Sequence, residues 1–172
     1  MDGTFPTRRV FGRLAPLVLA TILVAPPGCS QFIGTTARSY LTKIRESPDP
    51  NIRYLAYAKL ATPECYDDPK QKEEAVKTLC EKLDGAQEPI ATRAVICRTL
   101  GVLGDPAARE ALIKAVSDPE GLVRVQACRA LGRVGKPEDA TILARVMTLD
   151  SLEDCRIAAV NGLGELGSKD PR

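Results

Sequence analysis

The sequence predicts an all-α protein, built as a short solenoid of about 3.5–4 stacked helical repeats. Alanine and leucine supply most of the apolar residues, aromatic residues make up only 4% of the chain, and tryptophan is absent. Such a composition suits closely packed helices better than a β-sandwich, which favours β-branched and aromatic residues. The same order of residues also recurs about every 31 positions, and self-similarity at a period of this length indicates a repeat architecture.

The first 28 residues are predicted to be a signal peptide rather than part of the fold. A polar stretch with Arg8, Arg9 and Arg13 precedes an uncharged apolar run at residues 14–25. This run is too short to span a membrane, which takes about 20 apolar residues, and it has the length of a signal-peptide core. The alternative is a buried N-terminal helix, which Pro16 and the prolines at residues 26–27 would break.

The end of this segment resembles the bacterial lipobox, because Gly28-Cys29 directly follows the apolar run. The resemblance implies a lipid on Cys29 and a protein exported to the bacterial cell envelope, where it is anchored to a membrane on the periplasmic side. Pro26 and Pro27 depart from the pattern. The alternative is therefore simple cleavage nearby, leaving Cys29 free or disulfide-bonded in a soluble exported protein. Residues 7–13 also resemble the twin-arginine export signature, although ordinary basicity of a signal peptide explains them equally well.

The rest of the chain divides into a linker with a leading helix (29–47), a repeat domain (48–167) and a polar tail (168–172). Apolar spacing, prolines and glycines predict where the helices lie. The leading helix is expected at 36–46 and a last, unpaired helix at 152–166. Between them, paired helices are expected at 50–61 with 70–83, 88–103 with 107–117, and 120–134 with 138–147.

Four arginines mark the repeat: Arg53, Arg93, Arg124 and Arg156. After each of the last three, leucine follows at plus seven and glycines at plus eight and plus eleven, while the copy at Arg53 keeps only the leucine. The plus-eight glycines are expected to let the paired helix approach closely. Gly135, at plus eleven, is expected to take the left-handed conformation that closes a helix.

The third unit shows how one repeat is built. Asp118-Pro119 suits a helix start, and an apolar face follows at helical spacing. Ile142, Leu143 and Val146 are expected to face inward from the second helix of this unit. These residues resemble HEAT-like repeats of the phycobilisome-lyase type, over roughly residues 48–167. The resemblance implies antiparallel helix pairs stacked into a right-handed superhelix, whose stability is a sum over neighbouring units.

The resemblance also implies a structural role for the four repeat arginines. Each is expected to pair with an acid of its own or an adjacent unit, forming an internal ladder rather than a ligand site. The candidate acids are Asp49, Glu88, Asp118, Glu120, Asp150 and Asp154.

Charge and composition exclude several functional classes. There is no histidine, which excludes a histidine base, a Ser-His-Asp triad and a histidine-containing metal site. After the signal segment the chain carries 21 basic and 21 acidic residues, so no basic excess favours nucleic acid. No CxxC pair, spaced calcium loop or phosphate-binding glycine motif is present. We therefore expect no enzymatic activity, no cofactor and no bound metal.

The cysteines of the repeats are expected to be small buried hydrophobic residues. Cys97 and Cys128 share one repeat position, four after the arginine, and a free cysteine packs well there. A disulfide between Cys65 and Cys80 is the alternative open to an exported protein.

These features predict a non-enzymatic scaffold that binds another protein, whose identity the sequence does not give. In HEAT-like stacks the second helices line the concave contact face. A lyase-like, chromophore-related accessory protein is the alternative that the resemblance leaves open. The last helix offers an apolar edge for a partner or a second copy. The polar residues expected on the concave face are Lys77, Glu81, Arg109, Lys114, Asp139 and Arg145.

Overall fold

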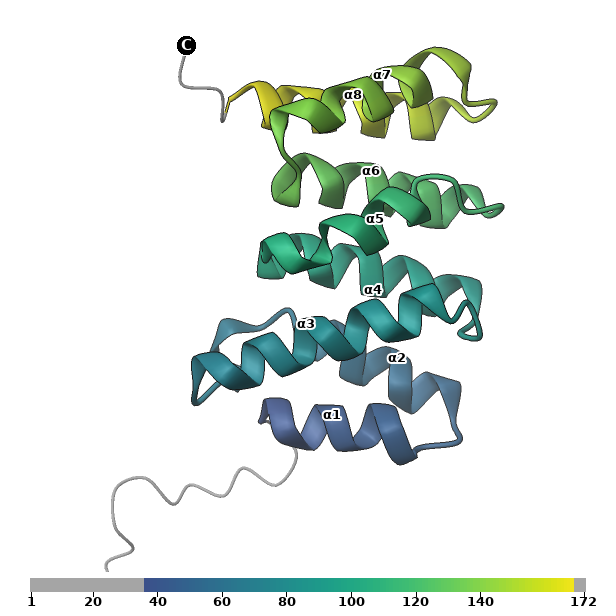
Figure 1. Ribbon diagram of the computed structural model, residues 1–172. Coiled ribbons are helices and arrows are strands. Elements are labelled where there is room, and N and C mark those ends of the chain that lie inside the picture. Colours follow the sequence, from purple (N-terminus) through teal and green to yellow (C-terminus); the bar gives the residue numbers. More distant parts are fainter. Residues whose placement is uncertain (1–35, 169–172) are drawn as a thin grey trace, which may run out of the picture. The chain divides into compact units, whose positions relative to one another are not determined.

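The computed structural model describes residues 36–168, which form eight α-helices and no β-strand (Figure 1). Three short 3-10 helices, η1 (Pro63–Cys65), η2 (Pro106–Ala108) and η3 (Pro137–Asp139), lie in the connections. Within this described part, no helix is long and apolar enough to cross a lipid bilayer. The α-helices are α1 (Ala37–Glu46), α2 (Pro50–Lys59), α3 (Pro69–Asp84), α4 (Ile90–Leu103), α5 (Arg109–Ala115), α6 (Gly121–Val134), α7 (Ala140–Leu149) and α8 (Glu153–Gly167).

The helices form two layers of an all-α solenoid, as the sequence predicts. Helices α2, α4, α6 and α8 pack on one another in chain order, and we call them the first-helix layer. Helices α1, α3, α5 and α7 form the second-helix layer, in which α3 contacts α1 and α5. Each of the pairs α3–α4, α5–α6 and α7–α8 joins the two layers (Figure 1).

Local sequence explains where the helices begin. Asp49 and Asp68 lie at the N-caps of α2 and α3, where each side chain accepts a hydrogen bond from a backbone N–H two residues on. A proline in the first turn follows both caps, where its missing N–H leaves no hydrogen bond unmade. Helices α5 and α7, the second helices of the later units, each begin with a 3-10 turn, η2 and η3, in place of the α-helical first turn that was expected.

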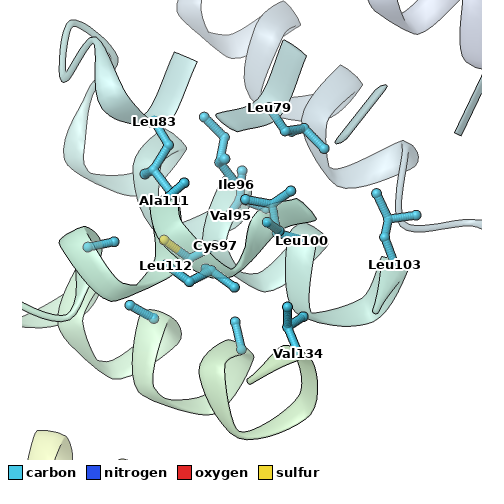
Figure 2. Close-up of a cluster of buried hydrophobic side chains, with 14 of the residues drawn as sticks. Leu79, Leu83, Val95, Ile96, Cys97, Leu100, Leu103, Ala111, Leu112 and Val134 are labelled. Carbon is cyan, nitrogen blue, oxygen red and sulfur yellow. The ribbon is translucent and has the colours of Figure 1, made fainter. Parts of the chain in front are cut away.

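One continuous apolar core runs through the stack between the two layers. Figure 2 shows its middle, where Leu79 of α3, Leu100 of α4 and Leu112 of α5 lie together. All three side chains are fully buried. The leucine seven residues after the repeat arginine is buried in each of the first three units, at Leu60, Leu100 and Leu131. The sequence repeat therefore places one core leucine in each of these units.

The plus-eight glycines allow a close approach, but not to the helix that sequence reasoning suggested. A Cβ added at Gly101 would lie 2.8 Å from Ala130, and one at Gly132 would lie 2.5 Å from the Gly162 Cα. Ala130 and Gly162 belong to the first helix of the next unit, not to the paired second helix. The glycines therefore set the spacing within the first-helix layer.

The plus-eleven glycines differ from one another. Gly104 has a φ of 66° and closes α4 in the left-handed conformation. The expectation for Gly135 was wrong, because its φ is −67° and its ψ is 172°. Gly135 is needed for a steric reason instead, since a Cβ there would lie 2.5 Å from the Leu131 carbonyl oxygen.

The cysteines of the described residues are free thiols, including Cys65 and Cys80. Cys97 and Cys128 are fully buried, as expected of small hydrophobic residues. Burial raises the pKa of each of these two thiols to about 12. Because the thiolate is the reactive form, neither side chain is suited to nucleophilic or redox chemistry.

Candidate functional site

Three of the repeat arginines bind a carboxylate of the following unit. An Arg53 Nη2 lies 2.9 Å from Glu88 Oε2, an Arg93 Nη2 lies 2.8 Å from Asp118 Oδ1, and Arg124 Nε lies 2.7 Å from Asp150 Oδ2. We call these three ion pairs the arginine ladder. None of the six side chains is more than 18% exposed. The ladder therefore fastens successive units to one another rather than presenting charge to a ligand.

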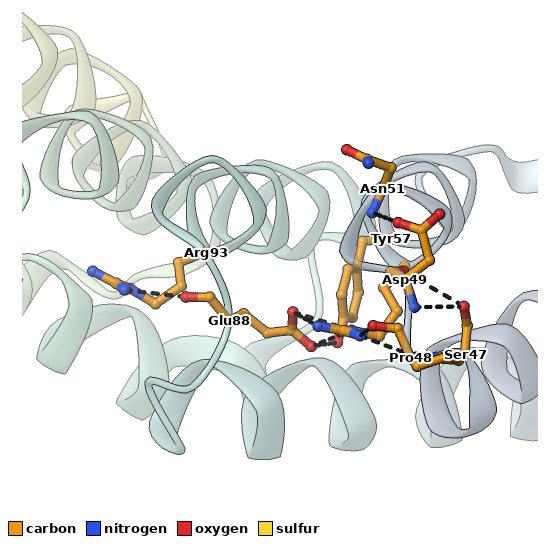
Figure 3. Close-up of polar contacts among 8 residues, drawn as sticks. Ser47, Pro48, Asp49, Asn51, Tyr57, Glu88 and Arg93 are labelled. Atoms are coloured by element: carbon orange, nitrogen blue, oxygen red, sulfur yellow. Dashed lines mark hydrogen bonds and ion pairs between the residues drawn. The ribbon is translucent and has the colours of Figure 1, made fainter.

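The same arginines also hold the start of their own helices. Arg124 Nη1 donates to the carbonyl oxygens of Asp118 and Pro119, both at 3.0 Å. Arg93 Nη1 donates to the Glu88 carbonyl oxygen at 3.2 Å, as Figure 3 shows. Each guanidinium thus connects the turn before its helix with the carboxylate of the next unit.

The first ladder carboxylate has an additional partner. The Tyr57 hydroxyl donates a 3.0 Å hydrogen bond to Glu88 Oε1, inside the core (Figure 3). Burial, followed by the charge of Glu88, raises the pKa of Tyr57 above its ordinary value. The tyrosine therefore stays a neutral donor that helps to satisfy a buried carboxylate.

A second inter-unit ion pair corrects one of the expected surface residues. Asp139 was expected on the contact face, but its side chain is 1% exposed and lies 2.6 Å from an Arg109 Nη2. It also accepts the Lys136 backbone N–H at 2.8 Å. Burial raises the pKa of Asp139, but the hydrogen bonds from Arg109 and Lys136 outweigh it, so the pKa lies below its ordinary value. Arg109 and Asp139 thus join two units in the second-helix layer.

A hollow of about 560 Å³ lies between the C-terminal end of α5 and α7, in the second-helix layer. We call it the α5–α7 groove. Its apolar wall includes Ile142, Val146 and Leu149, and the Leu149 side chain is 72% exposed. Arg145 lies at the same groove and is exposed. The full lining is Val116, Ser117, Arg124, Thr141, Ile142, Arg145, Val146, Leu149 and Asp150.

A second hollow of about 450 Å³ lies between the ends of α1 and α3. Its lining is mostly polar and includes Arg45, Glu81 and Lys82. Between the two hollows, Lys114 of α5 lies 3.2 Å from Asp84 of α3, with the two side chains 68% and 42% exposed. An ion pair so open to solvent contributes about 0–1 kcal/mol and leaves this stretch of the layer polar.

The structure distributes the six expected contact residues unevenly. Arg145 lines the α5–α7 groove and Glu81 lines the α1–α3 hollow, whereas Lys77 is exposed on α3 outside both. Lys114, Arg109 and Asp139 are engaged in ion pairs.

Sequence reasoning missed the apolar wall of the groove. Ile142 and Val146 pack against the core, as expected, but both are only half-buried and also line the hollow. Leu143 is the only fully buried residue of α7. The sequence did contain a signal that could have revealed the groove. The second helix of the third unit, α7, has more apolar residues than its one buried side can accommodate.

Metal-ligating side chains do not cluster in the part of the chain that the structure describes. Among residues 36–168, no three His, Cys, Asp or Glu side chains lie close enough to hold a metal ion. What the second-helix layer offers is an apolar strip with cationic and anionic side chains around it. An apolar strip with a polar rim is the usual anatomy of a protein-binding surface.

The chain is similar to a known protein family. Residues 76–164 match a family model described as HEAT repeats. No curated protein matches the chain. The matched segment begins in α3 and ends in α8, so it includes the arginine ladder from Glu88 onward and the whole α5–α7 groove.

Proposed function

This chain belongs to the family of HEAT-repeat proteins, and on that basis we propose that it is a non-enzymatic scaffold whose α5–α7 groove binds another protein. HEAT repeats commonly serve as protein-interaction scaffolds. The observation that carries the proposal is Leu149, a large apolar side chain left 72% exposed beside a groove of about 560 Å³.

The groove indicates what kind of segment it takes. Ile142, Val146 and Leu149 follow one another at helical spacing along α7 and form one apolar strip. Arg145 stands exposed at the same groove. The groove therefore fits an amphipathic segment that buries a few apolar side chains and brings a carboxylate to Arg145.

A cross-linking experiment tests this assignment. A photo-reactive residue in place of Leu149 is expected to cross-link the full chain to a distinct protein in cells that produce it. The same residue in place of Leu122, which is 52% exposed on α6, is the control. Equal products from both positions would refute the groove as the contact site.

The binding contribution of the groove is also measurable. Leu149→Ser removes an exposed apolar anchor, so we expect the captured partner to bind at least about tenfold more weakly, as for a typical contact hot spot. The melting temperature is expected to stay unchanged, because little of this side chain is buried. Leu122→Ser is the matched control, and partner loss in both variants would argue against the groove.

We further propose that this scaffold is exported to the bacterial cell envelope and anchored by a lipid on Cys29. The support is the sequence alone: basic residues, an apolar run and Gly28-Cys29 in order. These residues lie outside the described part of the structure. With two or three acyl chains on one cysteine, the protein would remain on the membrane surface.

The Cys29→Ser variant tests the anchor. It is expected to leave the membrane fraction, whereas the wild type stays with the membranes after a high-salt wash. A wild-type protein that is exported but fractionates as soluble would indicate simple cleavage near Cys29 instead. Membrane association that is unchanged in the variant would refute the lipid anchor.

A further inference from the structure

The two ends of the described stack carry complementary half-units. At one end, α1 belongs to the second-helix layer and packs on α2 and α3. At the other end, α8 belongs to the first-helix layer and packs on α6 and α7. Figure 1 shows these two single helices at opposite ends of the stack. One end therefore lacks a first-layer helix and the other lacks a second-layer helix, within residues 36–168.

Helix α8 exposes apolar residues that inner units bury against their next neighbour. Val160 is 51% exposed, whereas Cys97 and Cys128, at the same repeat position, are both 0% exposed. Ile157 is 48% exposed, whereas its equivalents Ala94 and Val125 in the two inner units are 5% and 8% exposed, and Tyr54 in the first unit is 38% exposed. The outer side of α8 thus keeps the residue type of a covered helix face.

The space beside one glycine of α8, Gly164, is also open. Gly101 and Gly132 meet the next first helix so closely that an added Cβ would lie within 2.8 Å of it. Gly164 stands at the same repeat position, and a Cβ added there meets nothing within 4 Å. The close-approach site is therefore present on α8 and open.

Among residues 36–168, the arginine of α8, Arg156, has no acidic partner. Arg156 Nη1 donates to the carbonyl oxygens of Asp150 at 2.9 Å and Ser151 at 3.4 Å, as the other repeat arginines hold their own turns. Each of the other repeat arginines binds a carboxylate that begins the next unit. For Arg156, no carboxylate of the described residues takes that place.

The opposite end carries an exposed acid, Asp49, at the start of α2. The side chain of Asp49 accepts the Asn51 backbone N–H at 2.8 Å, and Asp150 accepts that of Leu152 at 2.9 Å while binding Arg124. Asp49 is exposed and, within the described residues, forms no ion pair. Asp49 is thus an exposed acid at the N-cap of α2, two residues beyond Ser47, which stands at the repeat position of Asp118 and Asp150.

Apolar residues surround this acid on α2. Ile52 is 43% exposed, whereas Thr92 and Val123, at the same repeat position, are 2% and 0% exposed. Leu55 is 60% exposed, whereas its equivalent Val95 is 6% exposed. In the inner units these two positions are covered by the preceding first helix, which α2 lacks.

We propose that two copies of this chain stack head to tail, with α8 of one copy packed against α2 of the second. Arg156 then binds the carboxylate of Asp49 in the other copy, which continues the arginine ladder across the junction. Val160 and Ile157 cover Ile52 and Leu55, and α1 of the second copy lies beside α8 as the missing second helix.

Charge complementarity supports this partner. Lys59 of α2 is exposed and stands six residues after its repeat arginine. In the later units this position is Ala130, which faces Gly101, and Gly162, which faces Gly132. The long side chain of Lys59 would pass over Gly164 toward Glu165, which is 42% exposed and lies 3.5 Å from Arg133 Nε of its own chain. The contact joins two different surfaces, so it leaves one α8 and one α2 free after each junction and produces open-ended assemblies.

Sedimentation of the solubilised full chain at rising concentration tests the proposal. We expect the mass to increase with concentration beyond a dimer. Val160→Glu, Arg156→Glu and Asp49→Arg are each expected to weaken association by about tenfold or more, since each places charge at a desolvated junction. Leu122→Glu, at an exposed site away from both ends, is the control. Melting curves verify that each variant is folded.

Exchanging the charges of Arg156 and Asp49 between two variants tests whether these two residues meet across the junction. An equimolar mixture of the Arg156→Glu and Asp49→Arg variants is expected to regain association, because the introduced glutamate of one chain then meets the introduced arginine of the other. A single mass at all concentrations would overturn the proposal. The proposal would also be overturned if Val160→Glu weakened the association while Asp49→Arg had no effect on it. That result would indicate an α8–α8 contact instead. Neither outcome bears on the groove, which the Leu149 variants test separately.

Discussion

At the scale of single residues, the most informative groups are the arginine-ladder pairs. Their carboxylates and guanidinium groups are no more than 18% exposed, so each charge depends on its partner for solvation. Removing one partner of a buried pair leaves the other charge uncompensated, and this costs far more than the loss of a surface pair. The ladder therefore fixes how each unit is placed against the next.

A comparison of two arginines of neighbouring elements tests this role. Arg124→Ala leaves the Asp150 carboxylate, 7% exposed, without its partner, so we expect a loss of about 3 kcal/mol of stability. Arg145→Ala removes an exposed side chain and is expected to change stability by less than about 0.5 kcal/mol. Chemical denaturation of both variants measures the difference. Similar losses would show that the ladder does not fasten the units.

The pH dependence of stability gives a second residue-scale test. Hydrogen bonds from Arg124 lower the pKa of Asp150 to about 2, from 3.8. A carboxyl group with a depressed pKa stabilises the fold above its unfolded pKa, and this contribution is lost as the pH falls toward the folded pKa. We expect it to be about 2 kcal/mol at neutral pH and to disappear between about pH 4 and pH 2.

Asp150→Asn is the variant for this measurement. Its stability difference from the wild type is expected to shrink over the same acidic range. A difference that stays constant from pH 6 to pH 3 would contradict the assignment of this pKa to the ladder.

At the scale of elements, the spacing of the first-helix layer depends on glycines at one repeat position. Two glycines of that position have opposite surroundings. Gly132 touches backbone atoms of Gly162, which cannot move away as a flexible side chain would, whereas Gly164 faces open space. The same substitution should therefore have opposite effects at the two sites.

Alanine substitutions test this contrast. Gly132→Ala is expected to destabilise the protein by about 1–3 kcal/mol through overpacking. Gly164→Ala is expected to stabilise α8 by about 0.5–1 kcal/mol, because alanine is the better helix former. Thermal unfolding at low protein concentration, where the chain is a monomer, measures both. Stabilisation by Gly132→Ala would mean that the two helices are farther apart than described.

At the scale of the whole described unit, stability is distributed along the stack. Each first helix contacts its neighbours in the layer and its own second helix, and one continuous core connects them. Such a stack gains stability mainly from interfaces between adjacent units. It leaves a second-helix surface on which the α5–α7 groove combines the apolar strip of α7 with polar side chains.

The sequence alone determined the fold class, the repeat period and the approximate position of every helix. The reason is that these features depend on local patterns: apolar spacing, caps, prolines and glycines within one unit. It also indicated that the repeat arginines pair with acids, but it left the choice of acids open. Whether Arg53 binds Asp49 or Glu88 depends on which turn lies beside the guanidinium in space.

Only the tertiary structure decided features that depend on contacts between units. Gly101 and Gly132 face the next first helix rather than the paired one, and Asp139 is buried by Arg109 from a neighbouring unit. Ile142 and Val146 have the spacing of core residues, yet they also line an open groove, because the short helix α5 ends beside α7 without covering them. A one-dimensional pattern records which residues are apolar or charged, whereas burial depends on what is packed against them.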